Sequence, residues 1–211
     1  MMKKLLLHLA AACCLVSLVH AQESTIGVYL DDAGTLCDGT STGGITVGSV
    51  WVNLSGAAAG GITGAEFRVD NSMKQFTTVG VSVDPGATVV LGDPFNADPR
   101  GPATLTGTNI AYATCQTGPR VRLMTFTLIE NSPTSDIELT VMRHAEPSNF
   151  TFDCPLLTLC DAPAFTKVCV GGQADSVHWR ATLNANTVQA ADCAAVGVSA
   201  TSWSQVKALY N

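Results

Sequence analysis

The sequence is poor in charged residues and in basic residues, and each shortage excludes a class of protein. Charged residues make up 13% of the 211 residues and hydrophobic residues 46%, which is not the composition of a disordered chain. Lys and Arg number 11 against 17 Asp and Glu, which argues against nucleic-acid binding. The residues typical of coiled coils are sparse. A globular protein of one domain, with or without an appendage, remains.

Residues 1–21 have the pattern of a secretory signal peptide. Lys3 and Lys4 precede a mostly apolar run over residues 5–19, and Val19-His20-Ala21 fits a small-x-small cleavage site. The run is too short for a transmembrane anchor. We expect cleavage to leave nine basic and 17 acidic residues, a net charge of −8. The mature chain, with no transmembrane segment, is expected to be secreted, extracellular, at the cell surface or in the periplasm.

Eight cysteines divide between this leader and the mature chain. Cys13 follows three alanines, which raises lipidation as an alternative, although Ala10 stands where a lipid-attachment motif normally has Leu. The mature chain keeps Cys37, Cys115, Cys154, Cys160, Cys169 and Cys193. An even number in an exported protein predicts three disulfides, and six cysteines allow 15 pairings. Our preferred set is Cys154–Cys160, Cys169–Cys193 and Cys37–Cys115.

The body of the chain has β-strand patterns separated by turn residues. The expected strands are 25–30, 45–54, 65–69, 77–83, 87–91, 110–114, 121–129, 137–142 and 166–170. The alternation of apolar residues changes phase within 45–54, so we expect a β-bulge at Gly48-Ser49. The segment 121–129 is apolar on both faces and is expected to lie centrally between two layers. No segment before residue 180 has a convincing helical period.

These patterns predict an all-β fold, a two-sheet antiparallel sandwich of jelly-roll or immunoglobulin-like topology over residues 22–170. Residues 171–200 are expected to form a loosely packed extension, tethered by Cys193, with a strand over 177–183. Residues 201–211 predict a short amphipathic helix, because a capping box begins at Ser202 and Trp203 starts an apolar face. That helix is interpreted either as docked on the body or as a sorting tail, since the ending resembles a tail of some exported bacterial proteins.

The sequence lacks the common catalytic motifs and predicts a protein that is not an enzyme. Only His144 and His178 survive leader removal, and both are interpreted as surface or interface residues. A hydrolase that uses one of them is a remote alternative. No organic cofactor is expected. Asp31, Asp32 and Asp38 lie in glycine-containing turns of the kind that suit calcium, but solvated carboxylates are the simpler interpretation.

Aromatic residues are few, at 6%, and Trp51 and Tyr29 are the candidates for an exposed surface that stacks on a sugar ring. The alternative is that both pack in the core.

The order of segments between residues 44 and 142 resembles a cohesin domain. The resemblance is carried by Gly44-Ile45-Thr46-Val47-Gly48, by Gly61-Ile62-Thr63-Gly64-Ala65-Glu66-Phe67 and by Leu123-Met124-Thr125-Phe126-Thr127-Leu128. It implies a cohesin-like jelly-roll sandwich that binds protein modules such as dockerins. The chain departs from the family in its six cysteines and in having Asp70-Asn71-Ser72 where a Tyr-Asp-Pro turn is usual. We expect an exported binding module for an extracellular or cell-surface protein, with carbohydrate binding as the alternative.

Overall fold

The computed structural model describes residues 24–71, 76–95, 107–130, 135–171, 180–188 and 190–191. The strands are β1 (Thr25–Tyr29), β2 (Asp38–Gly39), β3 (Gly44–Asn53), β4 (Ile62–Asn71), β5 (Phe76–Val83), β6 (Ala87–Asp93), β7 (Gly107–Gln116), β8 (Arg120–Glu130), β9 (Ile137–Met142), β10 (Leu156–Leu159), β11 (Lys167–Cys169) and β12 (Arg180–Leu183). A 3-10 turn, η1 (Gly56–Ala58), is the one helical element of the described residues. The described part of the chain holds no helix long and apolar enough to cross a membrane. The signal peptide, the expected helix over 201–211, Cys193 and His178 lie outside these ranges.

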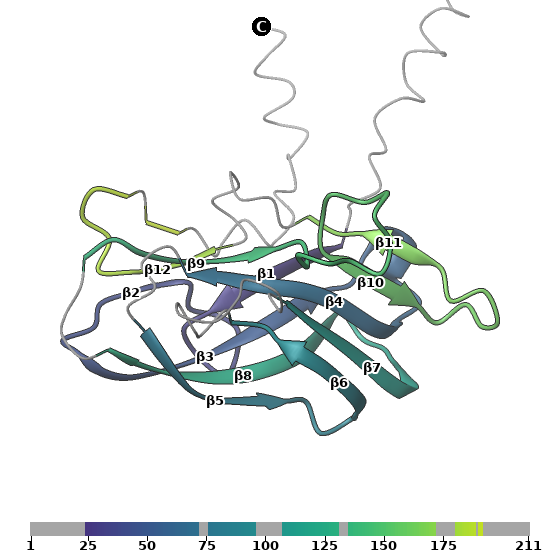
Figure 1. The fold of residues 1–211 in the computed structure, drawn as a ribbon, viewed down its shortest axis with the longest axis horizontal. Helices are drawn as coiled ribbons and strands as arrows, with labels where there is room; N and C mark the ends of the chain where they lie inside the picture. The colour runs from purple at the N-terminus through teal and green to yellow at the C-terminus, as the bar shows by residue number, and fades with distance from the viewer. Residues whose placement is uncertain are drawn as a thin grey trace, which may run out of the picture.

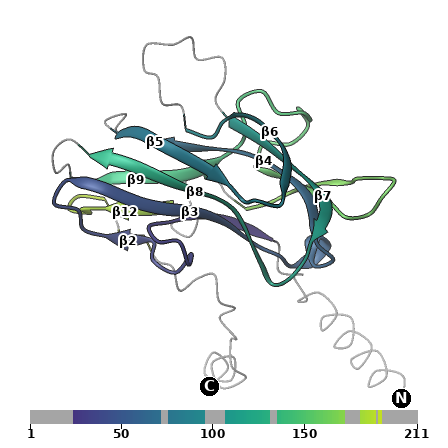
Figure 2. The ribbon, with the colours of Figure 1, turned by 90° about the horizontal axis from the view of Figure 1, so that it is seen from below.

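Two sheets pack face to face, as the sequence predicts (Figure 1). The smaller sheet has the order β1-β3-β8-β5, and Figure 2 shows β3 and β8 running side by side within it. The larger sheet has the order β11-β10-β4-β9-β12-β2, with β7 paired to β4 and β6 paired to β7. The first half of β4 lies between β10 and β7, and its second half pairs with β9. This long strand therefore holds the larger sheet together.

The core forms between the sheets because alternate residues of each strand face inward. Phe67 of β4 and Leu139 of β9 are fully buried, and Phe126 of β8 is 1% exposed. The Phe126 ring meets Phe95 edge-on, with 4.8 Å between the ring centroids. Burial of such side chains is the main favourable term in folding.

Strand β3 corrects one expectation. Its pairing with β8 is regular from Gly44 to Val50, so there is no bulge at Gly48-Ser49, and the irregularity falls between Val50 and Trp51. Ile45 and Val47, which suggested a change of phase, are 71% and 47% exposed on the outer face. The physical reason is that apolar side chains also occur on the solvent-facing side of a strand. Ile45 and Val47 therefore did not mark a change in which face of the strand is buried.

Strand β8 is central within the smaller sheet, between β3 and β5, but only one of its faces is buried. Met124, Phe126 and Leu128 are buried, whereas Thr125 and Thr127 are partly exposed. The expectation of two covered faces is therefore wrong. Thr125 and Thr127 suit the uncovered face of this strand, because threonine favours the β conformation.

The sandwich continues beyond residue 170, where we expected it to end. Strand β12 pairs with β9 and with β2, and its Ala181, Thr182 and Leu183 are buried. This part of the expected extension is thus an integral strand of the larger sheet.

The disulfides differ from the preferred pairing. Cys115 bonds to Cys160 and Cys154 to Cys169. Cys37 is also disulfide-bonded. Proximity in sequence suggested Cys154 with Cys160, but these cysteines flank opposite ends of β10. The β10–β11 register instead brings Cys154 next to Cys169.

Candidate functional site

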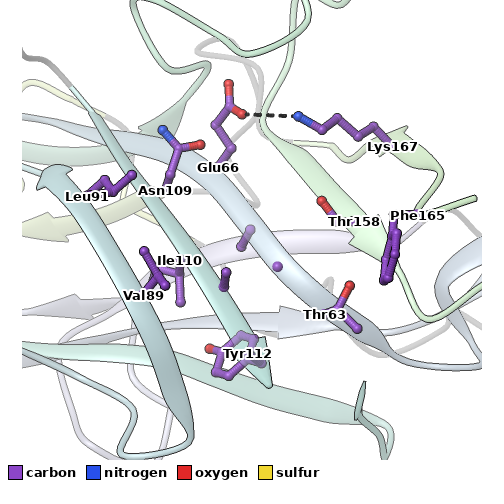
Figure 3. Close-up of a pocket in the computed structure, with 13 residues that line it drawn as sticks. Thr63, Glu66, Val89, Leu91, Asn109, Ile110, Tyr112, Thr158, Phe165 and Lys167 are labelled. Atoms are coloured by element: carbon purple, nitrogen blue, oxygen red, sulfur yellow. Dashed lines mark ion pairs between the residues drawn. The ribbon is translucent and has the colours of Figure 1, made fainter. Parts of the chain in front are cut away.

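A hollow of about 340 Å³ opens on the outer face of the larger sheet. Strands β4, β7 and β6 form its floor and one wall, and β10, β11 and the loop between them form the other wall. In Figure 3, Val89 and Leu91 lie on one side of this hollow, and Thr158 and Phe165 lie on the other.

Small residues make the floor low. Gly64 and Ala111 are paired neighbours on β4 and β7. A Cβ atom added to Gly64 would lie 2.9 Å from the carbonyl oxygen of Ile110, so no larger residue fits without moving the backbone. The hollow therefore depends on glycine at this position.

The rim is apolar and open to solvent. Val89 is 45% exposed, Leu91 is 62% exposed and Phe165 is 50% exposed. Large apolar side chains gathered around a concavity favour contact with another molecule.

A buried carboxylate lies at one end of the hollow. Glu66 is 5% exposed and accepts a 2.7 Å hydrogen bond from the Ser148 backbone N–H and another from the Ser148 hydroxyl. The Lys167 ammonium lies 3.8 Å from the same carboxylate (Figure 3) and also donates to the Ser148 oxygen. A buried charge needs such compensation, and here it fixes the 148 loop against the hollow.

The loop that carries Phe165 is held by Asp161. The Asp161 carboxylate accepts hydrogen bonds from the hydroxyl and the backbone N–H of Thr166, and these bonds lower the pKa of Asp161. The Cys115–Cys160 disulfide joins this loop to β7, in the opposite wall. A Cβ on Gly61 would lie 2.6 Å from the Cys115 sulfur, so glycine also makes room for the bridge. Both walls are thereby preorganised.

The three carboxylates considered for calcium have separate partners. Asp31 accepts hydrogen bonds from its own turn, at 2.8 Å from the Thr35 N–H and 3.0 Å from the Leu36 N–H. Burial raises the pKa of Asp31, but the bonds from Leu36 and Thr35 outweigh it and the net shift is downward. Asp32 pairs with Arg122 at 2.7 Å, and Asp38 accepts from the Thr182 hydroxyl. The described residues contain no group of three His, Cys, Asp or Glu placed to hold a metal.

Tyr29 and Trp51 do not form an exposed aromatic surface. Tyr29 is 3% exposed, so its interpretation as a platform is wrong. The Arg120 guanidinium lies 5.4 Å from the Tyr29 ring centroid and 4.7 Å from that of Trp51. Arg120 also donates to the Gly34 carbonyl at 2.6 Å. The turn after β1 and this cation cover the aromatic face that a sugar would need.

His144, interpreted from the sequence as a surface or interface residue, is buried in the chain, at 9% exposure. Its Nδ1 accepts a hydrogen bond from the Glu146 N–H at 3.1 Å, and its ring packs against Gly107. The imidazole is therefore engaged in structure.

Sequence reasoning missed the hollow as a site. Two features of the sequence pointed to it. The alternation of the 87–91 strand places Val89 and Leu91 on one face, and Gly64 interrupts a strand whose other residues have side chains. Nothing in the sequence showed that the 161–166 loop lies opposite them, because that placement follows from the β10–β4 pairing and the Cys115–Cys160 bridge.

Comparison with solved structures identifies the architecture. A cohesin module from a Clostridium perfringens family 33 glycoside hydrolase superposes with a TM-score of 0.50 at 8% identity, over 78% of this chain and 98% of that module. A type II cohesin domain from the Acetivibrio cellulolyticus cellulosome gives 0.49 at 12% identity, over 77% of this chain and 96% of the domain. The sixth cohesin of scaffoldin B from the same organism, solved with a dockerin, gives 0.47 at 11% identity, over 78% and 100%.

Neither the protein-family models nor the curated proteins contain a match to the sequence. At 8% identity the Clostridium perfringens module shows a shared fold and nothing finer. The two sheets, their strand order and this superposition together establish that the chain is a β-sandwich with a cohesin-like fold.

Proposed function

We propose that this chain is an exported, non-catalytic module that binds a protein partner at the hollow. The signal-peptide pattern and the disulfides support export, because disulfides persist in oxidising compartments. The sequence resemblance supports a protein partner of the dockerin kind.

The observation that carries the proposal is the apolar rim around a low floor, between two preorganised walls. Interfaces place apolar and aromatic side chains at their centre and polar groups around them. Val89, Leu91 and Phe165 supply the apolar part, and the Glu66–Lys167 pair supplies a polar margin. A projecting side chain of a folded partner fits an open hollow with these features.

The charged group at the end of the hollow and the nearby histidine are used in structure. Ser148 and Lys167 both face the Glu66 carboxylate, which engages the lysine as an ion-pair partner. His144 is buried with its Nδ1 already bonded. Nucleophilic catalysis requires a base free to accept a proton from the nucleophile, and this arrangement favours binding over turnover.

The test measures binding of a panel of recombinant dockerins by calorimetry to the disulfide-bonded protein and to two variants. Phe165→Asn removes the rim aromatic and keeps a residue that tolerates the positive φ of 47° at this position. The matched control is Phe150→Asn, because Phe150 is 75% exposed and does not line the hollow.

We expect a dockerin to bind the parent and the Phe150→Asn protein, and Phe165→Asn to weaken binding at least about tenfold, which corresponds to about 1.4 kcal/mol. Equal loss in both variants would place the site elsewhere. Absence of binding to every dockerin, with binding to a glycan array, would replace the proposal with carbohydrate recognition.

A further inference from the structure

We propose that β6 is a self-pairing edge, through which two copies of the chain join antiparallel, β6 to β6, so that their larger sheets become continuous. This association lies beyond the binding at the hollow, because it uses the backbone edge of the strand.

Strand β6 is the outermost strand on its side of the larger sheet (Figure 1). It pairs with β7 from Ala87 to Asp93, with an irregularity between Ala87 and Val89, and the described residues place no strand on its other side. Such an edge presents unpaired N–H and C=O groups, which are a template for another extended strand.

The large exposed side chains in the middle of β6 are apolar. Val89, Val90 and Leu91 are exposed by 45%, 42% and 62%, and residues 87–92 contain no charge and no proline. Proteins normally protect an edge with lysine, proline or a very short strand. The other two edges of the larger sheet follow that rule, since β2 has two residues and β11 has three, including Lys167. The seven-residue β6 has an irregularity in its register between Ala87 and Val89, at one end, and no such protection over Val89-Val90-Leu91.

A second copy suits this edge because of the placement of charge. The register that pairs all seven residues has Val90 opposite Val90 and Val89 opposite Leu91, so apolar side chains meet across the two-fold axis. Asp93 then lies opposite Ala87, so that the one charged residue of β6 never faces its own copy.

The first experiment is a cross-link at the proposed axis, in the full exported protein with its native disulfides. Opposite residues of an antiparallel pair have Cα atoms about 4.5–5.5 Å apart, which is within the range for a disulfide. Val90→Cys is therefore expected to give a covalent dimer on mild oxidation, with a 90–90 linked peptide in the mass spectrum. Ile45→Cys, at a position that is 71% exposed on the other sheet, is the control and is expected to give no covalent dimer.

The second experiment measures the mass of the unmodified protein by sedimentation equilibrium. We expect a dimer, and expect Val90→Lys to convert it to a monomer because two ammonium groups would face each other. Ile45→Lys is expected to remain dimeric. Circular dichroism checks that both variants are folded.

Three results would overturn the proposal: a monomeric parent, a dimer that Val90→Lys leaves intact, or cross-linking of Val90→Cys no faster than that of Ile45→Cys. The hollow is tested separately, because Phe165→Asn is expected to leave the dimer unchanged. Loss of dockerin binding with an intact dimer, or the reverse, therefore distinguishes the two proposals.

Discussion

At the scale of single residues, the space around a glycine decides whether a side chain fits there. Gly48 lies on the inward face of β3, where an added Cβ would come within 2.6 Å of Phe126 Cε2 and of the Tyr29 carbonyl oxygen. Gly80 on β5 is the opposite case, with nothing within 4 Å of an added Cβ. The two strands that flank β8 thus carry glycines in different surroundings: Gly48 has no room for a side chain, and Gly80 has room for one.

The difference predicts opposite effects of the same substitution. Gly48→Ala is expected to lower the free energy of unfolding by about 1–3 kcal/mol, the usual cost of overpacking a core. Gly80→Ala is the matched control and is expected to be neutral or to stabilise by up to about 1 kcal/mol, because alanine restricts the unfolded chain. Urea denaturation of both variants measures this. A Gly48→Ala protein as stable as the parent would show that the Phe126 ring moves aside at no cost.

At the scale of elements, Asp136 fastens the segment after β12 to the start of β9. Its carboxylate accepts hydrogen bonds from the backbone N–H groups of Asn186, Thr187 and Val188, and from the Thr187 hydroxyl. These bonds, with that of the Thr187 hydroxyl first, hold the pKa of Asp136 far below its usual range. Asp136 has φ of 60°, a conformation that Asp and Asn tolerate.

Because the pKa of Asp136 is lower in the folded than in the unfolded state, its carboxylate stabilises the fold above the unfolded pKa of about 3.9. This stabilisation is lost as the pH falls toward the folded pKa. Asp136→Asn keeps the backbone conformation but removes the charge. We expect the parent to have a higher melting temperature than this variant at pH 6–7. The difference in melting temperature is expected to narrow steadily below about pH 4. Melting curves from pH 7 to pH 2 test it, and other carboxylates cancel in the comparison. A gap that is the same at every pH would contradict the assignment.

At the scale of the whole molecule, the disulfides restrict the unfolded chain to different extents. Cys115–Cys160 spans 45 residues and Cys154–Cys169 spans 15. In the chain-entropy description a longer loop loses more entropy, so the bridges are expected to contribute about 4 and about 3 kcal/mol.

We therefore predict that the Cys115→Ser/Cys160→Ser double variant is less stable than Cys154→Ser/Cys169→Ser by about 1 kcal/mol. Guanidinium denaturation of each variant, with its other disulfides intact, is the measurement. The reverse order would mean that native-state packing around Cys154 outweighs the entropy of the unfolded chain.

The strand positions were predictable because they depend on local alternation. Residues 25–30 and 137–142 became β1 and β9 nearly as expected. Asp84-Pro85-Gly86 forms a turn between the expected strands 77–83 and 87–91, with the Ala87 N–H bonded to the Asp84 carbonyl at 2.9 Å. The short β2 and β10 were missed, since two to four residues carry too little periodicity. The site was not predictable in the same way. Asp31 and Trp51 were chosen by residue type, but Asp31 binds the backbone of its own turn and Trp51 contacts the Arg120 guanidinium.

The sequence by itself determined the class of fold, its approximate strands and the resemblance to cohesins, because these follow from residue periodicity and turn chemistry that act over a few positions. Only the tertiary structure decided which cysteines pair, that β12 joins the sheet, and that Val89 and Phe165 face each other across the hollow. Those facts depend on strand order and register between segments far apart in the chain. A shift of one residue in register reverses the face of every side chain, and local sequence does not carry that information.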